Sequence, residues 1–151
     1  MKNLAKAYLL SAADGAHVDV RSGRGPWIFL IAHGADCEGC RNYADELVGA
    51  RAQFGEWGAR LAVVLHAPLE QARALHVQLE ATVEIFADPE QSLDAEAGSV
   101  LVTDEWGDVF HSTHAGAAHA FPAPAEVAKW AQFVAIQCPE CEQPEGGWRD
   151  I

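Results

Sequence analysis

Four cysteines form two C-x-x-C pairs, which are the clearest candidates for chemistry in this sequence. The first pair is Cys37 and Cys40, and the second is Cys138 and Cys141. A cysteine in the first turn of a helix is stabilised as the thiolate by unpaired backbone N–H groups and by the helix dipole. A second thiol three residues later can resolve the mixed disulfide that the first thiol forms. The spacing therefore indicates disulfide exchange, provided that a pair opens a helix.

The chain around the first pair predicts a strand followed by a helix. Residues 27–32 read W-I-F-L-I-A, a continuous apolar run typical of a central strand that is buried on both faces. The apolar residues that recur at helical spacing after the pair are Tyr43, Leu47, Ala50 and Phe54. With Asp36 as the predicted N-cap, Cys37 lies at the start of that helix and Cys40 one turn inside it. We therefore predict that Cys37 attacks a disulfide and that Cys40 resolves the product.

Further along the chain, strands and helices alternate. The segments predicted there are strands at 61–65, 83–87, 99–103 and 108–111, helices at 69–79, at 88–95 and from 124 onward, and, nearer the N-terminus, an edge hairpin around 18–20. The alternation implies parallel β-α-β crossovers, whereas the turn at 104–107 joins an antiparallel hairpin. These elements predict one α/β domain over residues 1–137 and an acidic tail, 138–151, that carries the second C-x-x-C pair.

The composition fits a packed domain and argues against several classes of partner. Half of the 151 residues are hydrophobic and 21% are charged, as in globular proteins. The formal net charge of -12 repels phosphate backbones and anionic lipids, so we expect neither nucleic acid nor a membrane as partner. The apolar stretch near the N-terminus is too short for a secretion signal, which favours a cytoplasmic protein. In that reducing compartment the cysteines are not expected to form structural disulfides.

Two further segments carry a family resemblance. Residues 83–91, V-E-I-F-A-D-P-E-Q, resemble the inserted strand of the redoxin branch of the thioredoxin-like superfamily, and residues 103–109, T-D-E-W-G-D-V, resemble its D-x-x-G hairpin. This branch includes the alkyl hydroperoxide reductase and thiol-specific antioxidant proteins. The resemblance implies a thioredoxin-like fold, in which a central mixed β-sheet with the inserted strand is flanked by helices. It also implies a thiol-disulfide oxidoreductase whose partner is a protein disulfide or a thiol reductant.

Several positions depart from the pattern of that branch. Gly98 stands where members usually have a cis-proline, in the platform that grips a substrate disulfide. Gly34 stands three residues before Cys37, where peroxidatic members carry Thr or Ser, so we expect dithiol exchange rather than peroxide reduction. Asp36 and Glu38 flank Cys37 and raise the cost of its thiolate. These departures predict weak disulfide reductase activity.

A metal carrier is an alternative function. Two histidines end neighbouring predicted strands at the edge where the first pair should lie, and thiolate with imidazole suits copper or zinc. The candidate ligands are Cys37, Cys40, His33 and His66. Two further histidines, His114 and His119, follow the hairpin toward the same edge.

A third possibility is a thioredoxin-fold interaction module without catalysis, which the glycine at position 98 favours. Neither this module nor the oxidoreductase requires a cofactor. The second dithiol, Cys138 and Cys141, is far from the first pair in the sequence. We expect it to cap the end of the last helix or to bind a metal between subunits.

Overall fold

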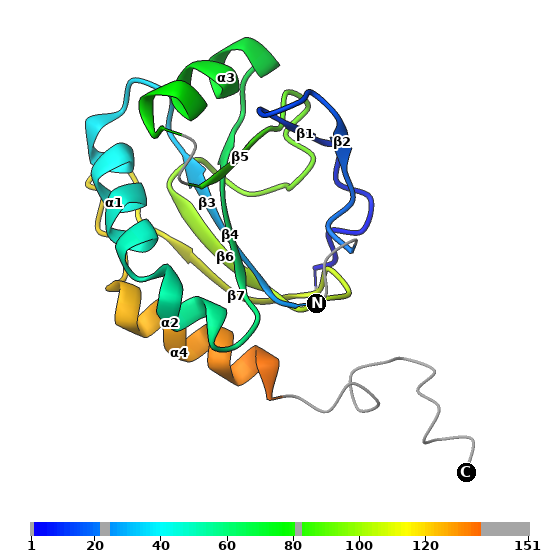
Figure 1. Ribbon diagram of the computed structural model, residues 1–151, viewed down its shortest axis with the longest axis vertical. Coiled ribbons are helices and arrows are strands. Elements are labelled where there is room, and N and C mark those ends of the chain that lie inside the picture. The colour runs from blue at the N-terminus through cyan, green and yellow to red at the C-terminus, as the bar shows by residue number, and fades with distance from the viewer. Residues whose placement is uncertain (1, 22–24, 81–82, 137–151) are drawn as a thin grey trace.

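A computed structural model describes residues 2–21, 25–80 and 83–136, and Figure 1 shows how their elements are arranged. The strands are β1 (Leu9–Ser11), β2 (His17–Val18), β3 (Trp27–Ala32), β4 (Arg60–Leu65), β5 (Glu84–Ala87), β6 (Ser99–Thr103) and β7 (Val109–His114). The helices are α1 (Glu38–Gly49), α2 (Arg51–Gly55), α3 (Leu69–Gln78) and α4 (Pro124–Ala135). The predicted α/β fold is confirmed, and α1 begins directly after Cys37.

The described strands form one seven-stranded mixed sheet with the order β2-β1-β5-β4-β3-β6-β7. Strand β3 pairs in parallel with β4, where Leu30 lies opposite Val63. On its other side β3 pairs antiparallel with β6, where Leu30 lies opposite Val100. All six residues of β3 are buried, as the apolar run predicts for a central strand. The strand therefore has a fixed place in the core, and it delivers the chain to the first cysteine pair at the sheet edge.

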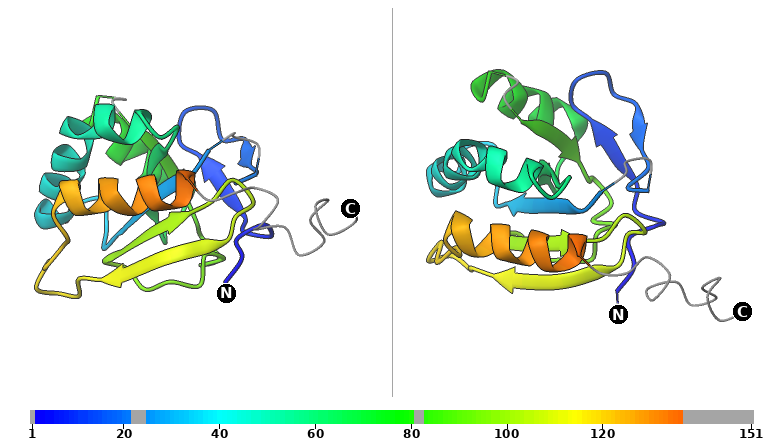
Figure 2. Two further views of the ribbon diagram at one scale, coloured as in Figure 1. Left: turned by 90° about the horizontal axis from the view of Figure 1, so that it is seen from below. Right: turned by 60° about the horizontal axis from the view of Figure 1, so that its bottom comes forward.

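Helices cover one face of the sheet and irregular chain covers the other (Figure 2). On the helical face, Leu47 of α1, Leu75 of α3 and Val127 of α4 belong to one buried cluster with the strands. On the opposite face, Leu4 and Leu93 belong to a second cluster, so the N-terminal segment and the chain after β5 close that side. Because both faces are packed, the start of α1 is held rigidly against the end of β3.

Two predicted details are wrong. The helix expected over 88–95 does not form, because the carboxylate of Asp88 accepts hydrogen bonds from the backbone N–H groups of Ser92 and Leu93 and holds this segment in turns. The N-cap of α1 is Cys37 rather than Asp36, so the helix begins one residue later than expected.

Some boundaries also differ from those predicted. Strand β7 continues to His114, beyond the expected end at 111, because β6 pairs with it over its full length. The edge hairpin joins β1 to β2 and ends at Val18. The tail with Cys138 and Cys141 lies outside the described residues, so the predicted domain boundary stays a prediction.

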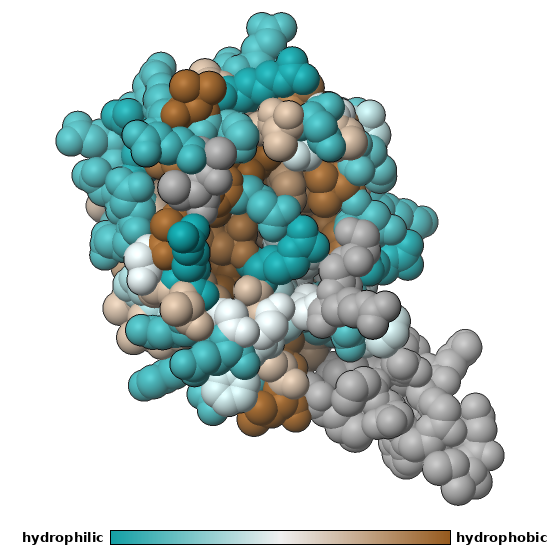
Figure 3. Space-filling view, viewed as in Figure 1, coloured by the Kyte–Doolittle hydropathy of each residue, from teal (hydrophilic) through white to brown (hydrophobic). Residues whose placement is uncertain are grey.

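Among the described residues, no helix is long and apolar enough to cross a lipid bilayer. Figure 3 shows mostly hydrophilic side chains on the outer faces of α1 and α3, with hydrophobic side chains visible between them. Large apolar side chains do reach the surface at single positions, which include Trp106 at the β6–β7 turn and Phe133 on α4.

Candidate functional site

The first C-x-x-C pair lies where β3 passes into α1. Cys37 is the N-cap residue of α1 and its side chain is half-buried, whereas Cys40 is one turn inside the helix and only 2% exposed. Both thiols are free. Cys40 belongs to the same buried cluster as Leu47, which packs α1 onto the sheet. One thiol therefore faces the surface and the other faces the core.

Each thiol has its own histidine. The Nε2 atom of His119 lies 3.1 Å from Cys37 Sγ, and the Nδ1 atom of His33 lies 3.2 Å from Cys40 Sγ. The backbone N–H of His33 also donates to Cys40 Sγ, at 3.3 Å. The two imidazole rings meet edge to face, with centroids 4.8 Å apart. These four side chains thus form one compact cluster.

Two glycines make room for the two rings. A Cβ atom at Gly39, inside the C-x-x-C motif, would lie 2.8 Å from Cδ2 of His119. A Cβ atom at Gly98 would lie 2.8 Å from Cε1 of His33, and Gly98 also has a φ of +90° that side chains rarely adopt. Neither position accepts another residue unless a histidine moves.

Aromatic contacts hold the chain that carries His119. Phe121 stacks on Tyr43 of α1 with ring centroids 4.3 Å apart, and the Tyr43 hydroxyl donates to the Pro122 carbonyl at 2.7 Å. The backbone of His119 itself has a φ of +55°, and its N–H donates to the Gly116 carbonyl. The turn is therefore fixed to the same helix that carries both thiols.

The two thiols differ in acidity. Burial opposes ionisation of Cys37, but hydrogen bonds from the Cys40 backbone, the Cys40 thiol and His119 outweigh it, so the pKa of Cys37 lies below its usual value. Burial raises the pKa of Cys40 to about 12, and the neighbouring Cys37 adds to this effect. The pair at neutral pH therefore consists of a more acidic outer thiol and a protonated inner thiol. The repulsion of the Cys37 thiolate by Asp36 and Glu38, which the sequence predicts, does not raise the pKa of Cys37 above its usual value.

The imidazole of His33 favours its neutral form. Burial lowers the pKa of His33 below 6.5, and the charges of His119 and His114 act in the same direction. At neutral pH this ring carries one N–H donor and one lone pair beside the buried thiol. We infer that it contacts Cys40 without adding a positive charge.

Three of the predicted metal ligands meet and one does not. His33, Cys37 and Cys40 lie together, and their donor atoms with that of His119 are all within 4.8 Å of one another. His66 follows β4 at the same edge, but its Nε2 lies 3.9 Å from the buried carboxylate of Asp88. Asp88 follows β5, the neighbour of β4 on the side away from β3, and His66 is not part of the cluster of donor atoms around the thiols.

His119 completes the cluster, although its position in the sequence indicates only that it follows the hairpin toward this edge. Its contact with Cys37 joins residues 82 positions apart. His114, the other histidine after the hairpin, lies 3.2 Å from a carboxylate oxygen of Glu96 instead. The proposed second dithiol, Cys138 and Cys141, lies outside the described residues.

The predicted substrate platform at Gly98 adjoins the site through His33. Its N–H donates to the Ile31 carbonyl at 2.6 Å, and its carbonyl accepts from the Ala115 N–H at 2.8 Å. Both backbone groups are thus already bonded within the chain. A role of Gly98 in gripping a substrate disulfide stays a prediction.

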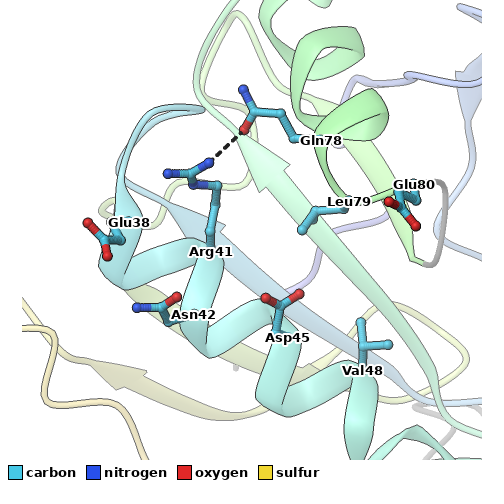
Figure 4. A pocket seen from close by; sticks show the side chains of 8 residues that line it. All are labelled: Glu38, Arg41, Asn42, Asp45, Val48, Gln78, Leu79 and Glu80. Atoms are coloured by element: carbon cyan, nitrogen blue, oxygen red, sulfur yellow. Dashed lines mark hydrogen bonds between the residues drawn. The ribbon is translucent and has the colours of Figure 1, made fainter.

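An open polar groove lies along α1, the helix that follows Cys37 (Figure 4). Its volume is about 480 Å³, and it runs between α1 and the end of α3. The Arg41 guanidinium reaches across it to Gln78, and the acidic side chains on its walls include Glu38 and Asp45. Neither thiol lines this groove, and Cys37 is partly exposed to solvent outside it.

Comparisons with known proteins agree with this fold. The AhpC/TSA family model matches residues 1–114, and no curated protein matches the sequence. Peroxiredoxin Q from Xanthomonas campestris is 12% identical with a TM-score of 0.71, covering 87% of this chain and 93% of that one. Peroxidoxin BcpB from Mycobacterium tuberculosis is 16% identical with a TM-score of 0.71, covering 91% and 97%. A putative electron transfer protein from Aquifex aeolicus is 12% identical with a TM-score of 0.66, covering 93% and 96%.

At these identities the structural likeness establishes the thioredoxin-like fold alone, whereas the family match covers most of the chain. The region that matches the family model includes Cys37 and Cys40 but ends before His119. The predicted redoxin resemblance is confirmed, and the chain belongs to the AhpC/TSA family of thiol-based redox proteins.

Proposed function

We propose that the protein is a thiol-disulfide oxidoreductase that acts on protein disulfides through Cys37 and Cys40. The observation that carries this proposal is the division of the pair into an outer and an inner thiol. Cys37 is half-buried at the N-terminus of α1 beside His119, and Cys40 is buried behind it. An accessible thiol with a stabilised thiolate and a protected second thiol are what the two successive steps of exchange require.

In the first step the Cys37 thiolate attacks one sulfur of the substrate disulfide. The new S–S bond joins Cys37 to the substrate, and the other substrate sulfur leaves as a thiolate. His119, 3.1 Å from Cys37 Sγ, is placed to hold the proton that Cys37 releases.

In the second step Cys40 attacks Cys37 Sγ and forms the Cys37–Cys40 disulfide. The mixed disulfide breaks, the second substrate sulfur leaves with the proton that Cys40 gives up, and two electrons have passed from the dithiol to the substrate. Burial keeps Cys40 protonated until this step, because its pKa is about 12. The free thiolate of Cys37 is thereby the nucleophile and Cys40 the resolving group.

Peroxide reduction would use the same Cys37 thiolate against an O–O bond. Gly34 stands where a hydroxyl side chain is expected in peroxidatic redoxins, and a Cβ atom there would have nothing within 4 Å. That position therefore supplies no side-chain donor to a bound peroxide. This observation supports disulfide exchange over peroxide reduction.

The test compares the two substrates under one set of conditions. The reduced, metal-free chain is assayed against insulin, and separately against hydrogen peroxide, with dithiothreitol as the final reductant. We expect insulin reduction that depends on Cys37 and on Cys40, and little peroxide consumption above that of the Cys37→Ser variant. Cys138→Ser with Cys141→Ser serves as the matched control and should keep the insulin activity.

Two results would overturn the proposal. Rapid peroxide consumption without insulin reduction would assign the site to peroxide chemistry. Failure of Cys37 to react with iodoacetamide until the protein unfolds would assign the chain to the class of non-catalytic interaction modules.

A further inference from the structure

The thiols and the two imidazoles provide four donor atoms of the kind that bind a borderline or soft metal ion. Two sulfurs and two ring nitrogens within one small volume match the tetrahedral S₂N₂ donor set of zinc. We propose that this cluster is a Zn²⁺ site that withdraws the dithiol from disulfide exchange, with His33, Cys37, Cys40 and His119 as ligands. The regulatory half of this inference rests on the proposed function, whereas the metal site does not.

The distances in the cluster are close to those that a tetrahedral zinc site needs. With Zn–S bonds of about 2.3 Å and Zn–N bonds of about 2.0–2.1 Å, neighbouring donors are separated by about 3.8 Å for S–S, 3.6 Å for S–N and 3.3 Å for N–N. The donor atoms here are within 4.8 Å of one another, and the two hydrogen-bonded S–N pairs are at 3.1 and 3.2 Å. A separation of 4.8 Å needs to shrink by about 1 to 1.5 Å, depending on the pair of donors, which side-chain torsions can supply.

The surroundings keep the four ligands in place without an added ion. Gly39 and Gly98 leave the space that the two imidazole rings occupy, and a Cβ atom at either position would intrude on a ring. The backbone N–H of His33 donates to Cys40 Sγ, a hydrogen bond that a zinc-bound thiolate can retain. The turn that carries His119 is fixed to α1 through the Phe121 ring stacked on Tyr43. Little chain ordering therefore opposes metal binding.

Charge also favours a divalent cation here. Two thiolates balance the charge of Zn²⁺ and the two imidazoles are neutral, so the bound site carries no net charge. Of its four ligands only Cys40 is fully buried, and His33 is exposed. The chain as a whole has a net charge of -12, which raises the local concentration of cations around it. Asp36 and Glu38, which flank Cys37, oppose its bare thiolate, and this repulsion is relieved in the neutral zinc-bound site.

Zinc and oxidation then compete for the same two sulfurs. Binding of Zn²⁺ to the dithiol releases two protons and forms two Zn–S bonds. Oxidation by a substrate disulfide breaks both bonds, forms the Cys37–Cys40 disulfide, reduces the substrate to two thiolates and releases Zn²⁺. Zinc at one equivalent should consequently slow disulfide exchange, and a chelator should restore it.

The binding experiment uses the reduced full-length chain with Cys138→Ser and Cys141→Ser, so that the tail thiols take no metal. Zn²⁺ is supplied in competition with the chromophoric chelator 4-(2-pyridylazo)resorcinol, under argon. We expect one Zn²⁺ per chain, and X-ray absorption showing two sulfur and two nitrogen ligands. The His119→Asn and His33→Asn variants should each lose at least about 10- to 100-fold in affinity, since even outer partners of zinc ligands contribute that much.

His66→Asn is the matched control, because this histidine lies at the same edge but contacts Asp88. Its zinc affinity should equal that of the parent. Absence of a stoichiometric site, a ligand set without nitrogen, or equal effects of His66→Asn and His119→Asn would overturn the metal site.

The two proposals fail separately. Insulin reduction by a chain that binds no zinc would leave the oxidoreductase and remove the metal site. A zinc-binding chain that reduces no disulfide would leave the metal site and remove the oxidoreductase. Disulfide reduction at an unchanged rate with the site fully loaded would remove the regulatory half.

Discussion

The contact between His119 and Cys37 offers the sharpest test of how the outer thiol is activated. In the His119→Asn variant the imidazole is lost, while asparagine tolerates the φ of +55° found at this position. The change removes the 3.1 Å contact to Cys37 Sγ. A hydrogen bond to a charged group contributes about 1.5–3 kcal/mol, which is about 1 to 2 pKa units. Because Cys37 is partly exposed, solvent screening favours the lower end.

The expected effect on reactivity is smaller than the pKa shift itself. A rise of about one unit lowers the thiolate fraction about tenfold at a pH below the pKa, but the more basic thiolate is also the better nucleophile, with a Brønsted slope of about 0.4–0.5. The net rate of alkylation should fall about three- to fourfold for a shift of one unit, and about 10- to 16-fold for a shift of two units.

The assay is the rate of iodoacetamide modification as a function of pH, in the reduced chain with Cys138→Ser and Cys141→Ser. The midpoint of the profile for Cys37 should move to higher pH in His119→Asn and stay in place in His66→Asn. Coincident profiles for the parent and His119→Asn would show that the imidazole does not stabilise the thiolate. An equal shift in both variants would show a general effect of losing a histidine.

Three further changes test the packing around the site. Gly98→Ala should destabilise the fold by about 1–3 kcal/mol in urea unfolding, because the backbone has a φ of +90° and the new Cβ meets the His33 ring. The control Gly34→Ala places a Cβ with nothing within 4 Å and should change stability by less than about 0.5 kcal/mol. Equal losses of stability in the two variants would contradict this expectation. Tyr43→Phe leaves the Pro122 carbonyl without its donor and should cost about 1 kcal/mol, and an unchanged urea midpoint would contradict this. Burial of the Cys40 thiol should also lower stability as pH rises from 9 toward 12, by up to about 1.4 kcal/mol per pH unit, since an unfolded thiol with a pKa of 9.0 ionises while Cys40 stays protonated to about 12. Above pH 10 the Tyr43 hydroxyl adds to this fall, because burial raises its pKa as well. Cys40→Ala should reduce that slope, and an equal slope in urea titrations of both proteins would contradict the raised pKa.

The main strands and helices could be predicted because the spacing of apolar residues along the sequence matches the faces that are buried. The run at 27–32 is apolar throughout, and β3 is buried on both faces. The apolar spacing after Cys40 matches the buried side of α1, where Tyr43 and Leu47 pack. The turns at 88–95 could not be predicted from apolar spacing. They form because the Asp88 carboxylate accepts hydrogen bonds from backbone N–H groups in place of helical hydrogen bonds.

The site was predictable as far as local geometry determines it. A strand that leads into a helix places Cys37 and Cys40, and the end of the strand places His33. The choice between His66 and His119 depends on contacts between distant parts of the chain. His66 lies near the buried Asp88, whereas the turn fixed by Tyr43 places His119 against Cys37. Neither contact has a periodic signature in the sequence.

The proposed mechanism has Cys37 attack a substrate disulfide and Cys40 resolve the product. It is tested most directly by trapping the intermediate in the Cys40→Ser variant, which retains the nucleophile but lacks the resolving thiol. The reduced, metal-free variant is incubated with insulin, quenched in acid and mapped by mass spectrometry without reduction. We expect an insulin peptide joined through a disulfide to Cys37. An adduct found only on Cys138 or Cys141, or the absence of any adduct while the protein remains folded, would contradict it.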